Sequence, residues 1–252
     1  MLNHRRFGSG RTVVLQHGFL GGGGYFAPAI NHLAPHFDVI APDLPGFAGS
    51  AGTPSPESLE GFTEVLVEFL SSIGVEKFSF LGHSTAGMIA QQIALDYPDR
   101  VERLVLYGTA SAGELPQRFE TFDQTIAKLE SNGIDASARG LAAAWFVNGE
   151  NDPFYEFCVS AGAGADLDSA IRTLRAVEKW RVTDRLNEID MPTLIICGDM
   201  DCSTHPEESI ALWRGIRGSK LCIVPDCAHN VHLEMPEVFN RVLSKFLLTG
   251  AA

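Results

Sequence analysis

The sequence predicts an α/β fold: a doubly wound, mostly parallel sheet with a helical cap inserted between two of its strands. Short apolar runs typical of strands alternate with segments of helical periodicity over the first 110 residues. This alternation lapses between residues 111 and 185, where the pattern is mostly helical, and it then resumes. We therefore expect an α/β core formed by residues 1–110 and 186–252 and a helical cap formed by residues 111–185.

The elements follow from the hydrophobic pattern. Apolar runs predict strands, and apolar residues spaced three and four apart predict helices. In the core, strands are expected at residues 11–16, 37–41, 78–81, 101–107, 193–197 and 220–225. Core helices are expected at residues 25–33, 55–74, 89–97, 206–214 and 236–246, and cap helices at 119–129, 136–146 and 170–180.

Composition excludes several classes of function. A net charge of −12 disfavours nucleic acid and anionic membranes as partners. No apolar run approaches the roughly 20 residues that span a bilayer, and the first ten residues lack the apolar segment of a signal peptide. The five cysteines form no C-x-x-C pair or zinc-ligand spacing. We expect a cytoplasmic protein with free thiols, no metal, no cofactor and a small-molecule substrate.

A glycine-rich loop, His17 to Gly24, follows the first predicted strand. Four successive glycines let the backbone approach a ligand closely. A phosphate-binding loop of the Walker type would end in G-K-[ST], whereas this loop continues with Tyr25 and Phe26. The loop therefore does not indicate nucleotide binding.

The segment 78–99 reads FSFLGHSTAGMIAQQIALDYPD and changes from strand to helix periodicity at Ser84. This is the setting of a nucleophile elbow, in which a tight turn exposes the serine hydroxyl above the sheet edge. Small residues are required on both sides, and Gly82 and Ala86 meet that requirement. An ordinary glycine-rich turn would give a similar pattern, so the remaining motifs must decide.

Ser84, Asp201 and His229 each come shortly after a predicted strand. The carboxyl ends of parallel strands meet at one edge of the sheet, so these side chains are expected to gather there. Ser84 would be the nucleophile, His229 the base and Asp201 the group that orients the imidazole. The backbone N–H groups of Phe19 and Thr85 are the expected donors to an oxyanion.

These motifs together resemble the α/β-hydrolase superfamily over nearly the whole chain. The matching segments are HGF (17–19), DLPGFAGS (43–50), GHSTAG (82–87), GDMD (198–201) and AHNVHLEMP (228–236). The family pattern places the acid three residues after Gly198, which favours Asp201 over Asp199. The pattern H-x-x-x-x-E-x-P favours His229 over His232.

Within the superfamily the chain is most similar to small, helically capped carboxylesterases, enol-lactone hydrolases and carbon–carbon bond hydrolases. The resemblance implies a serine hydrolase that cleaves a small ester or lactone through an acyl-enzyme. Carbon–carbon bond hydrolysis of a ring-cleavage diketo acid is an alternative, although such enzymes often have Trp where this chain has Asn230. A non-catalytic ligand-binding protein on the same fold is the other alternative, and the intact triad argues against it.

Three aromatic residues are expected to border the substrate pocket. Tyr25 adjoins the glycine-rich loop, and Trp145 and Phe146 belong to a run, 141–147, that is apolar nearly all round. A helix of this kind is buried on more than one side, so it could face both the cap interior and the pocket. We therefore expect a mainly apolar pocket that accepts a compact hydrophobic group.

Overall fold

The computed structural model describes residues 1–249 and contains one seven-stranded sheet. Its strand order is β1-β3-β2-β4-β5-β6-β7, and only the pairing of β1 with β3 is antiparallel. This arrangement confirms the predicted α/β class with a mostly parallel sheet. The strands are β1 (His4–Phe7), β2 (Thr12–Gln16), β3 (Asp38–Pro42), β4 (Phe78–His83), β5 (Val101–Tyr107), β6 (Thr193–Gly198) and β7 (Lys220–Val224).

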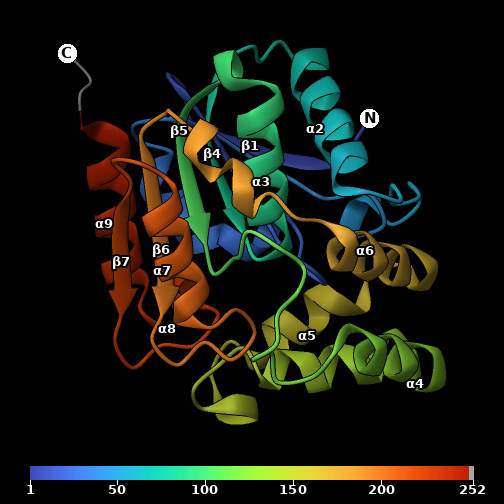
Figure 1. Ribbon diagram of the computed structural model, residues 1–252. Coiled ribbons are helices and arrows are strands. Elements are labelled where there is room, and N and C mark those ends of the chain that lie inside the picture. Colours follow the sequence, from blue (N-terminus) through green and yellow to red (C-terminus); the bar gives the residue numbers. More distant parts are fainter. Residues whose placement is uncertain (250–252) are drawn as a thin grey trace.

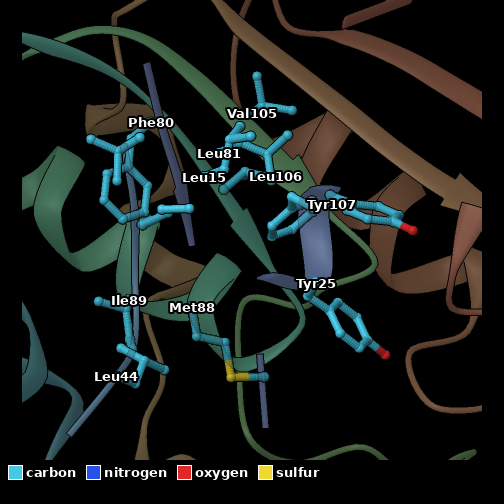
Figure 2. Close-up of a cluster of buried hydrophobic side chains, with 14 of the residues drawn as sticks. Leu15, Tyr25, Leu44, Phe80, Leu81, Met88, Ile89, Val105, Leu106 and Tyr107 are labelled. Atoms are coloured by element: carbon cyan, nitrogen blue, oxygen red, sulfur yellow. The ribbon is translucent and has the colours of Figure 1, made fainter. Parts of the chain in front are cut away.

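The central strands are buried on both faces. Every residue of β3, β4 and β6 is buried, as parallel strands require when helices cover both sides of the sheet. Figure 2 shows the resulting core, in which side chains of the neighbouring strands β2, β4 and β5 lie close to Met88 and Ile89 of the following helix. A rigid sheet of this kind fixes the positions of the loops at its carboxyl edge.

Helices α2 and α3 pack against each other, and α1 packs against α9. None of the helices within residues 1–249 is long and apolar enough to cross a membrane. The α-helices are α1 (Ala27–Leu33), α2 (Leu59–Ser72), α3 (Thr85–Asp96), α4 (Phe122–Ala143), α5 (Tyr155–Ala163), α6 (Leu167–Lys179), α7 (Pro206–Gly215), α8 (Val231–Glu234) and α9 (Pro236–Leu248).

Helices α4, α5 and α6, here called the inserted helices, follow β5 and precede β6. Figure 1 shows α4 and α5 at the end of the sheet toward which the arrowheads of β5, β6 and β7 point. The inserted helices pack on one another through α4, which contacts both α5 and α6. They therefore lie at the edge of the sheet where the loops carrying Ser84, Asp201 and His229 begin.

The structure differs from the sequence expectation in four elements. Strand β1 and the helices α5 and α8 were not predicted, and the two helices expected at 119–129 and 136–146 form one element, α4, with a kink. The kink is at Gly133, whose backbone is not helical (φ +77°, ψ 178°). Glycine accepts this positive φ without steric cost, so the helix axis can change direction there.

Candidate active site

Ser84 lies in a sharp turn between β4 and α3. Its backbone has φ +56° and ψ −122°, a conformation that costs a non-glycine residue about 1–3 kcal/mol. The turn is held because the Ser84 amide donates to the Tyr107 carbonyl and the Ser84 carbonyl accepts from Gly87 N–H and the Thr109 hydroxyl, each at 2.8 Å. The surrounding backbone thus maintains the strained position of the serine.

The glycine two residues before Ser84 is required by close packing. A Cβ atom on Gly82 would lie only 2.1 Å from the carbonyl oxygen of Ala86. At Gly87 an added Cβ would lie 2.5 Å from the side chain of Thr109. Strand and helix therefore nearly touch at this turn, as a nucleophile elbow demands.

Asp201 and His229 form a buried pair next to Ser84. The Nδ1 atom of His229 lies 2.7 Å from Oδ2 of Asp201, and both side chains are almost completely buried. The Asp201 carboxylate also accepts hydrogen bonds from the amides of Ser203 (2.8 Å) and Thr204 (3.0 Å) and from the Thr204 hydroxyl (3.1 Å). These donors hold the carboxylate in place, so Nδ1 of His229 is fixed as a donor and Nε2 remains for a substrate or Ser84.

The two competing residues have other surroundings. Asp199 is exposed, and within residues 1–249 its carboxylate accepts a single long hydrogen bond, 3.4 Å, from the Cys227 amide. His232 is buried, and its Nδ1 lies 2.9 Å from the hydroxyl of Tyr107. Burial lowers the pKa of His232 to about 3, so its ring is neutral at physiological pH. The geometry therefore favours Asp201 and His229 as the acid and base.

A hydrogen-bond network lies behind the His229 main chain. The Tyr107 hydroxyl donates to the His229 carbonyl oxygen at 3.0 Å and accepts from the His232 amide at 3.1 Å. The ring of His83 is stacked on Tyr107 and its Nε2 lies 3.1 Å from the same carbonyl oxygen. Burial lowers the pKa of His83 well below its usual value, so this ring is a neutral donor. Two donors thus fix the backbone of the candidate base.

The glycine-rich loop approaches the serine directly. A Cβ on Gly18 would lie 2.8 Å from both the Ser84 Cβ and the His83 carbonyl oxygen, so the loop backbone touches the elbow. The Phe19 amide, one residue later, donates no hydrogen bond to another backbone group within residues 1–249. The Thr85 amide is the first of α3, where helical amides have no partner inside the helix. Both predicted oxyanion donors are therefore available beside Ser84.

Asp43 and His17 hold the glycine-rich loop in its position. The Asp43 carboxylate accepts hydrogen bonds from the amides of Gly23 (2.5 Å) and Gly49 (3.0 Å). The His17 ring accepts from the Leu44 amide through Nε2 at 2.9 Å, while its Nδ1 lies 2.8 Å from the carbonyl oxygen of the next residue. Burial lowers the pKa of His17 to about 4, which keeps the ring neutral in this role.

Two small cavities adjoin Ser84 and His229, and both are also lined by Phe19 and Trp145. The larger has a volume of about 40 Å³ and the smaller about 10 Å³. Ser84 and His229 make no hydrogen bond to each other in residues 1–249, and such bonds are often long before substrate binds. The shared cavities place the hydroxyl and the imidazole in one site.

The predicted pocket aromatics lie in different places. Tyr25 lines the smaller cavity and donates a hydrogen bond to Asn230 at 3.2 Å. Trp145 lines both cavities, and its ring centroid is 6.4 Å from that of His229. Phe146 is buried in the core and lines neither cavity.

Several lining residues were not identified from the sequence. They come from α3, from the segment between β5 and α4, from the inserted helices and from the loop after Asp201, and no local motif marks them. Among them, only Arg118 carries a full charge. The others are Met88, Leu115, Phe122, Leu141, Leu174, Val177, Ser203 and Thr204.

The segment after α4 is hydrogen-bonded to the loop that carries His229. Glu234 accepts hydrogen bonds from the amides of Ala228 and Val147, each at 2.8 Å, and so joins the His229 loop to the segment after α4. The Asn230 amide donates to the Trp145 carbonyl at 3.2 Å. These hydrogen bonds connect the segment after α4 to the loop that carries the candidate base. Among residues 1–249, no group of three His, Cys, Asp or Glu side chains is placed to hold a metal ion.

The comparisons with known proteins are consistent with this geometry. The family model for the alpha/beta hydrolase fold matches residues 11–151. The protein named putative carbamate hydrolase RutD from Agrobacterium fabrum is 29% identical over 243 residues, which cover 94% of this chain and 93% of its own.

Two solved structures superpose closely. The enol-lactonase from Burkholderia xenovorans LB400 superposes with a TM-score of 0.91 at 22% identity, and the match covers 98% of this chain and 96% of the enol-lactonase chain. This similarity concerns the fold. A thermophilic esterase from Thermogutta terrifontis has a TM-score of 0.88 at 27% identity, covering 98% of this chain and 92% of its own.

Proposed function

The chain belongs to the α/β-hydrolase fold family, and on this premise we propose that it is a serine hydrolase that cleaves a small carboxylic ester or lactone through an acyl-enzyme. The observation that carries the proposal is the buried hydrogen bond of 2.7 Å between Asp201 and His229, whose ring lines the same cavity as the strained Ser84. A nucleophile, a base and an orienting acid are the three groups that acyl transfer by serine needs.

The geometry supports the following sequence of steps. Ser84 Oγ attacks the substrate carbonyl carbon while His229 Nε2 takes the hydroxyl proton, because Nδ1 is already committed to Asp201. The carbonyl oxygen becomes an oxyanion that the amides of Phe19 and Thr85 stabilise. The imidazolium then gives its proton to the leaving oxygen, the C–O bond breaks, and water activated by His229 releases the acid.

The size of the cavity supports a compact acyl group. A single water needs roughly 10–15 Å³ of such volume, so about 40 Å³ accommodates a group of two or three heavy atoms. Longer acyl groups would have to extend past Leu115, Arg118 and Phe122, which line both this cavity and a wider groove of about 620 Å³, or displace the inserted helices. We propose that these helices act as the cap whose position limits acyl length.

A carbamate is the second candidate substrate. The similarity over 94% of the chain to a relative named as a carbamate hydrolase favours it, and the same triad would form a carbamoyl-enzyme. Carbon–carbon bond hydrolysis has less support, because Asn230 follows His229 and binds the Tyr25 hydroxyl. A non-catalytic role would leave the strain at Ser84 without a purpose.

A turnover screen tests the proposal. Purified protein is assayed with p-nitrophenyl acetate, butyrate and octanoate, simple lactones, a phenyl carbamate and a ring-cleavage diketo acid. We expect turnover of the short esters or lactones, and Ser84→Ala should lose on the order of 10⁴-fold in kcat. Ser160→Ala, an exposed serine on α5, is the matched control and should retain full activity. Equal activity of the Ser84 variant and the wild type would refute the proposal.

A further inference from the structure

Arg118 lines the cavity beside Ser84, and we propose that it binds a carboxylate group carried by the substrate. This inference rests on the proposed function, because it specifies the substrate class of the same site: an ester, lactone or carbamate with a negatively charged carboxylate some distance from the reacting carbonyl. Arg118 lies between β5 and α4, in the segment that leads from the sheet into the inserted helices.

The guanidinium is held in a fixed orientation. It lies over the rings of Phe119 and Phe122, with its central carbon 4.9 Å and 4.8 Å from their centroids. Nη1 donates to the Glu120 carbonyl at 2.5 Å and to the Thr125 hydroxyl at 3.1 Å. A cation fixed on two aromatic faces loses little rotamer entropy when it binds a further partner.

The free edge of this guanidinium is the edge that binds carboxylates. Nε and Nη2 of Arg118 donate no hydrogen bond to any group in residues 1–249. These two nitrogens form one side of the planar fork and match the two oxygens of a carboxylate. Arg6 shows the same geometry within this protein, since its Nε and Nη2 bind the two oxygens of Asp38 at 2.9 Å and 2.8 Å.

No carboxylate of the described chain lies within ion-pair distance of Arg118. The nearest acid in sequence, Glu120, accepts from the Thr125 hydroxyl at 2.7 Å and forms its own ion pair with Lys128. Burial lowers the pKa of Arg118, and the nearby charge of Glu120 opposes this shift only in part. A half-buried cation with no carboxylate in ion-pair contact is costly, and a substrate carboxylate would offset that cost.

The rest of the cavity lining contains no Asp, Glu, Lys or further Arg side chain, and it is mostly apolar. A bound substrate therefore meets one cation, Arg118, and one reacting centre, Ser84. Arg118 also lines a wider outer groove of about 620 Å³, whose other charged lining residues are Glu114, Glu120, Glu178 and Glu208. These glutamates disfavour an anion elsewhere in the groove, so the carboxylate should be held only in direct contact with Arg118.

The test compares anionic and neutral substrates of matched size. The monomethyl esters of succinate, glutarate and adipate are assayed beside their dimethyl esters, because the chain length that spans Ser84 and Arg118 is the variable. Acetylcholine and its neutral analogue 3,3-dimethylbutyl acetate form the cationic pair. The variants are Arg118→Gln, Arg118→Lys and, as a matched control on α4, Arg139→Gln, whose arginine is exposed and paired with Glu156.

In the wild type, we expect kcat/KM for one monomethyl ester to exceed that of its dimethyl ester by about 10-fold or more. Arg118→Gln should lower kcat/KM for that monoester by about 10- to 100-fold and for the diester by no more than about 3-fold. Arg118→Lys should recover only part of the loss, because lysine cannot bind both oxygens. Arg139→Gln should match the wild type.

Calorimetric binding of glutarate and glutaramide to the wild type keeps the inference testable if no ester is turned over or a variant fails to fold. Binding of glutarate but not glutaramide supports it, and equal or absent binding of both overturns it. Ser84-dependent hydrolysis of the diesters without preference for any monoester overturns the role of Arg118 while the hydrolase proposal stands. Preference for acetylcholine over its neutral analogue also overturns it. If the wild-type protein turns over none of the esters but binds glutarate and not glutaramide, the proposed function is refuted while the role of Arg118 stands.

Discussion

Replacing Asp201 by Asn should inactivate the protein by changing the tautomer of His229. One oxygen of Asp201 accepts from the amides of Ser203 and Thr204 at 2.8 Å and 3.0 Å, so the oxygen of Asn would occupy this position. The Asn NH₂ group would then face His229 Nδ1, where the Asp201 oxygen now lies at 2.7 Å. Nδ1 would have to accept a hydrogen bond, which places the ring proton on Nε2.

An imidazole protonated at Nε2 cannot take the Ser84 proton. We therefore expect kcat to fall by about 10⁴-fold, which corresponds to about 5 kcal/mol of transition-state stabilisation. The unfolding midpoint should change little, because the two backbone amides keep their acceptor. Steady-state kinetics on p-nitrophenyl acetate with thermal unfolding as a folding control measures both effects.

Asp199→Asn is the matched control for this prediction. Asp199 lies two residues from Asp201, is exposed and forms no hydrogen bond or ion pair with His229. Its variant should keep kcat within about 3-fold of the wild type, since exposed substitutions away from the site rarely have large effects. A folded Asp201→Asn protein with more than a tenth of wild-type kcat, or an Asp199→Asn protein that is equally inactive, would refute this reasoning.

Three further predictions concern stability and specificity. Gly82→Ala should lower the free energy of unfolding by at least about 3 kcal/mol, because the added Cβ would lie 2.1 Å from a backbone oxygen of α3. Gly140→Ala should raise it by about 0.5–1 kcal/mol, because open space surrounds this position in α4. Urea unfolding measures both changes. Burial lowers the pKa of His17 to about 4 and that of His232 to about 3. Below pH 6.5 the unfolded chain therefore binds more protons than the folded protein. The free energy of unfolding should fall as the pH drops from 6.5 toward 4, by about 1.4 kcal/mol per pH unit for each ring. Equal stability at pH 7 and pH 5 would contradict this. Trp145→Ala should raise kcat/KM for butyrate relative to acetate, because it enlarges the cavity; an unchanged ratio in an acyl-length series would exclude Trp145 from the acyl site.

The sheet and the elbow could be predicted because their sequences satisfy local and global requirements at once. The strand at β4, the small residue Gly82 and the helix after Ser84 all indicate the same turn, and the structure shows that a larger residue at position 82 would strike the backbone. The places of Asp201 and His229 followed from the rule that loops after parallel strands share one edge.

Strand β1 could not be predicted, because its sequence HRRF carries the charges of an exposed edge strand and only pairing with β3 makes it a strand. Helix α5 was missed because small residues near its end interrupt the apolar periodicity. Both elements are formed by tertiary contacts that the local pattern does not contain.

The residues that line the cavity could not be predicted from the sequence, because they depend on how the inserted helices pack. Trp145 and Phe146 are neighbours in one apolar run, yet only Trp145 lines the cavity. Both residues lie after α4, which ends at Ala143, so the helix expected over 136–146 does not extend to them and its periodicity could not place their side chains. Arg118 had no sequence signal, since nothing in the run from Glu114 to Phe119 shows that the arginine lacks an acidic partner. That fact depends on where Glu120 and Lys128 lie in space.

The central claim is that Ser84 is a nucleophile activated by His229, and covalent labelling with a fluorophosphonate tests it most directly. Wild-type protein is treated with the probe, digested and mapped by mass spectrometry, and the labelling rate is compared with that of His229→Ala. The account predicts a single adduct on the peptide containing Ser84, formed at least about 100-fold more slowly in His229→Ala because a hydroxyl without its base is a poor nucleophile. An adduct on another residue, no adduct, or an equal rate in the two proteins would contradict it.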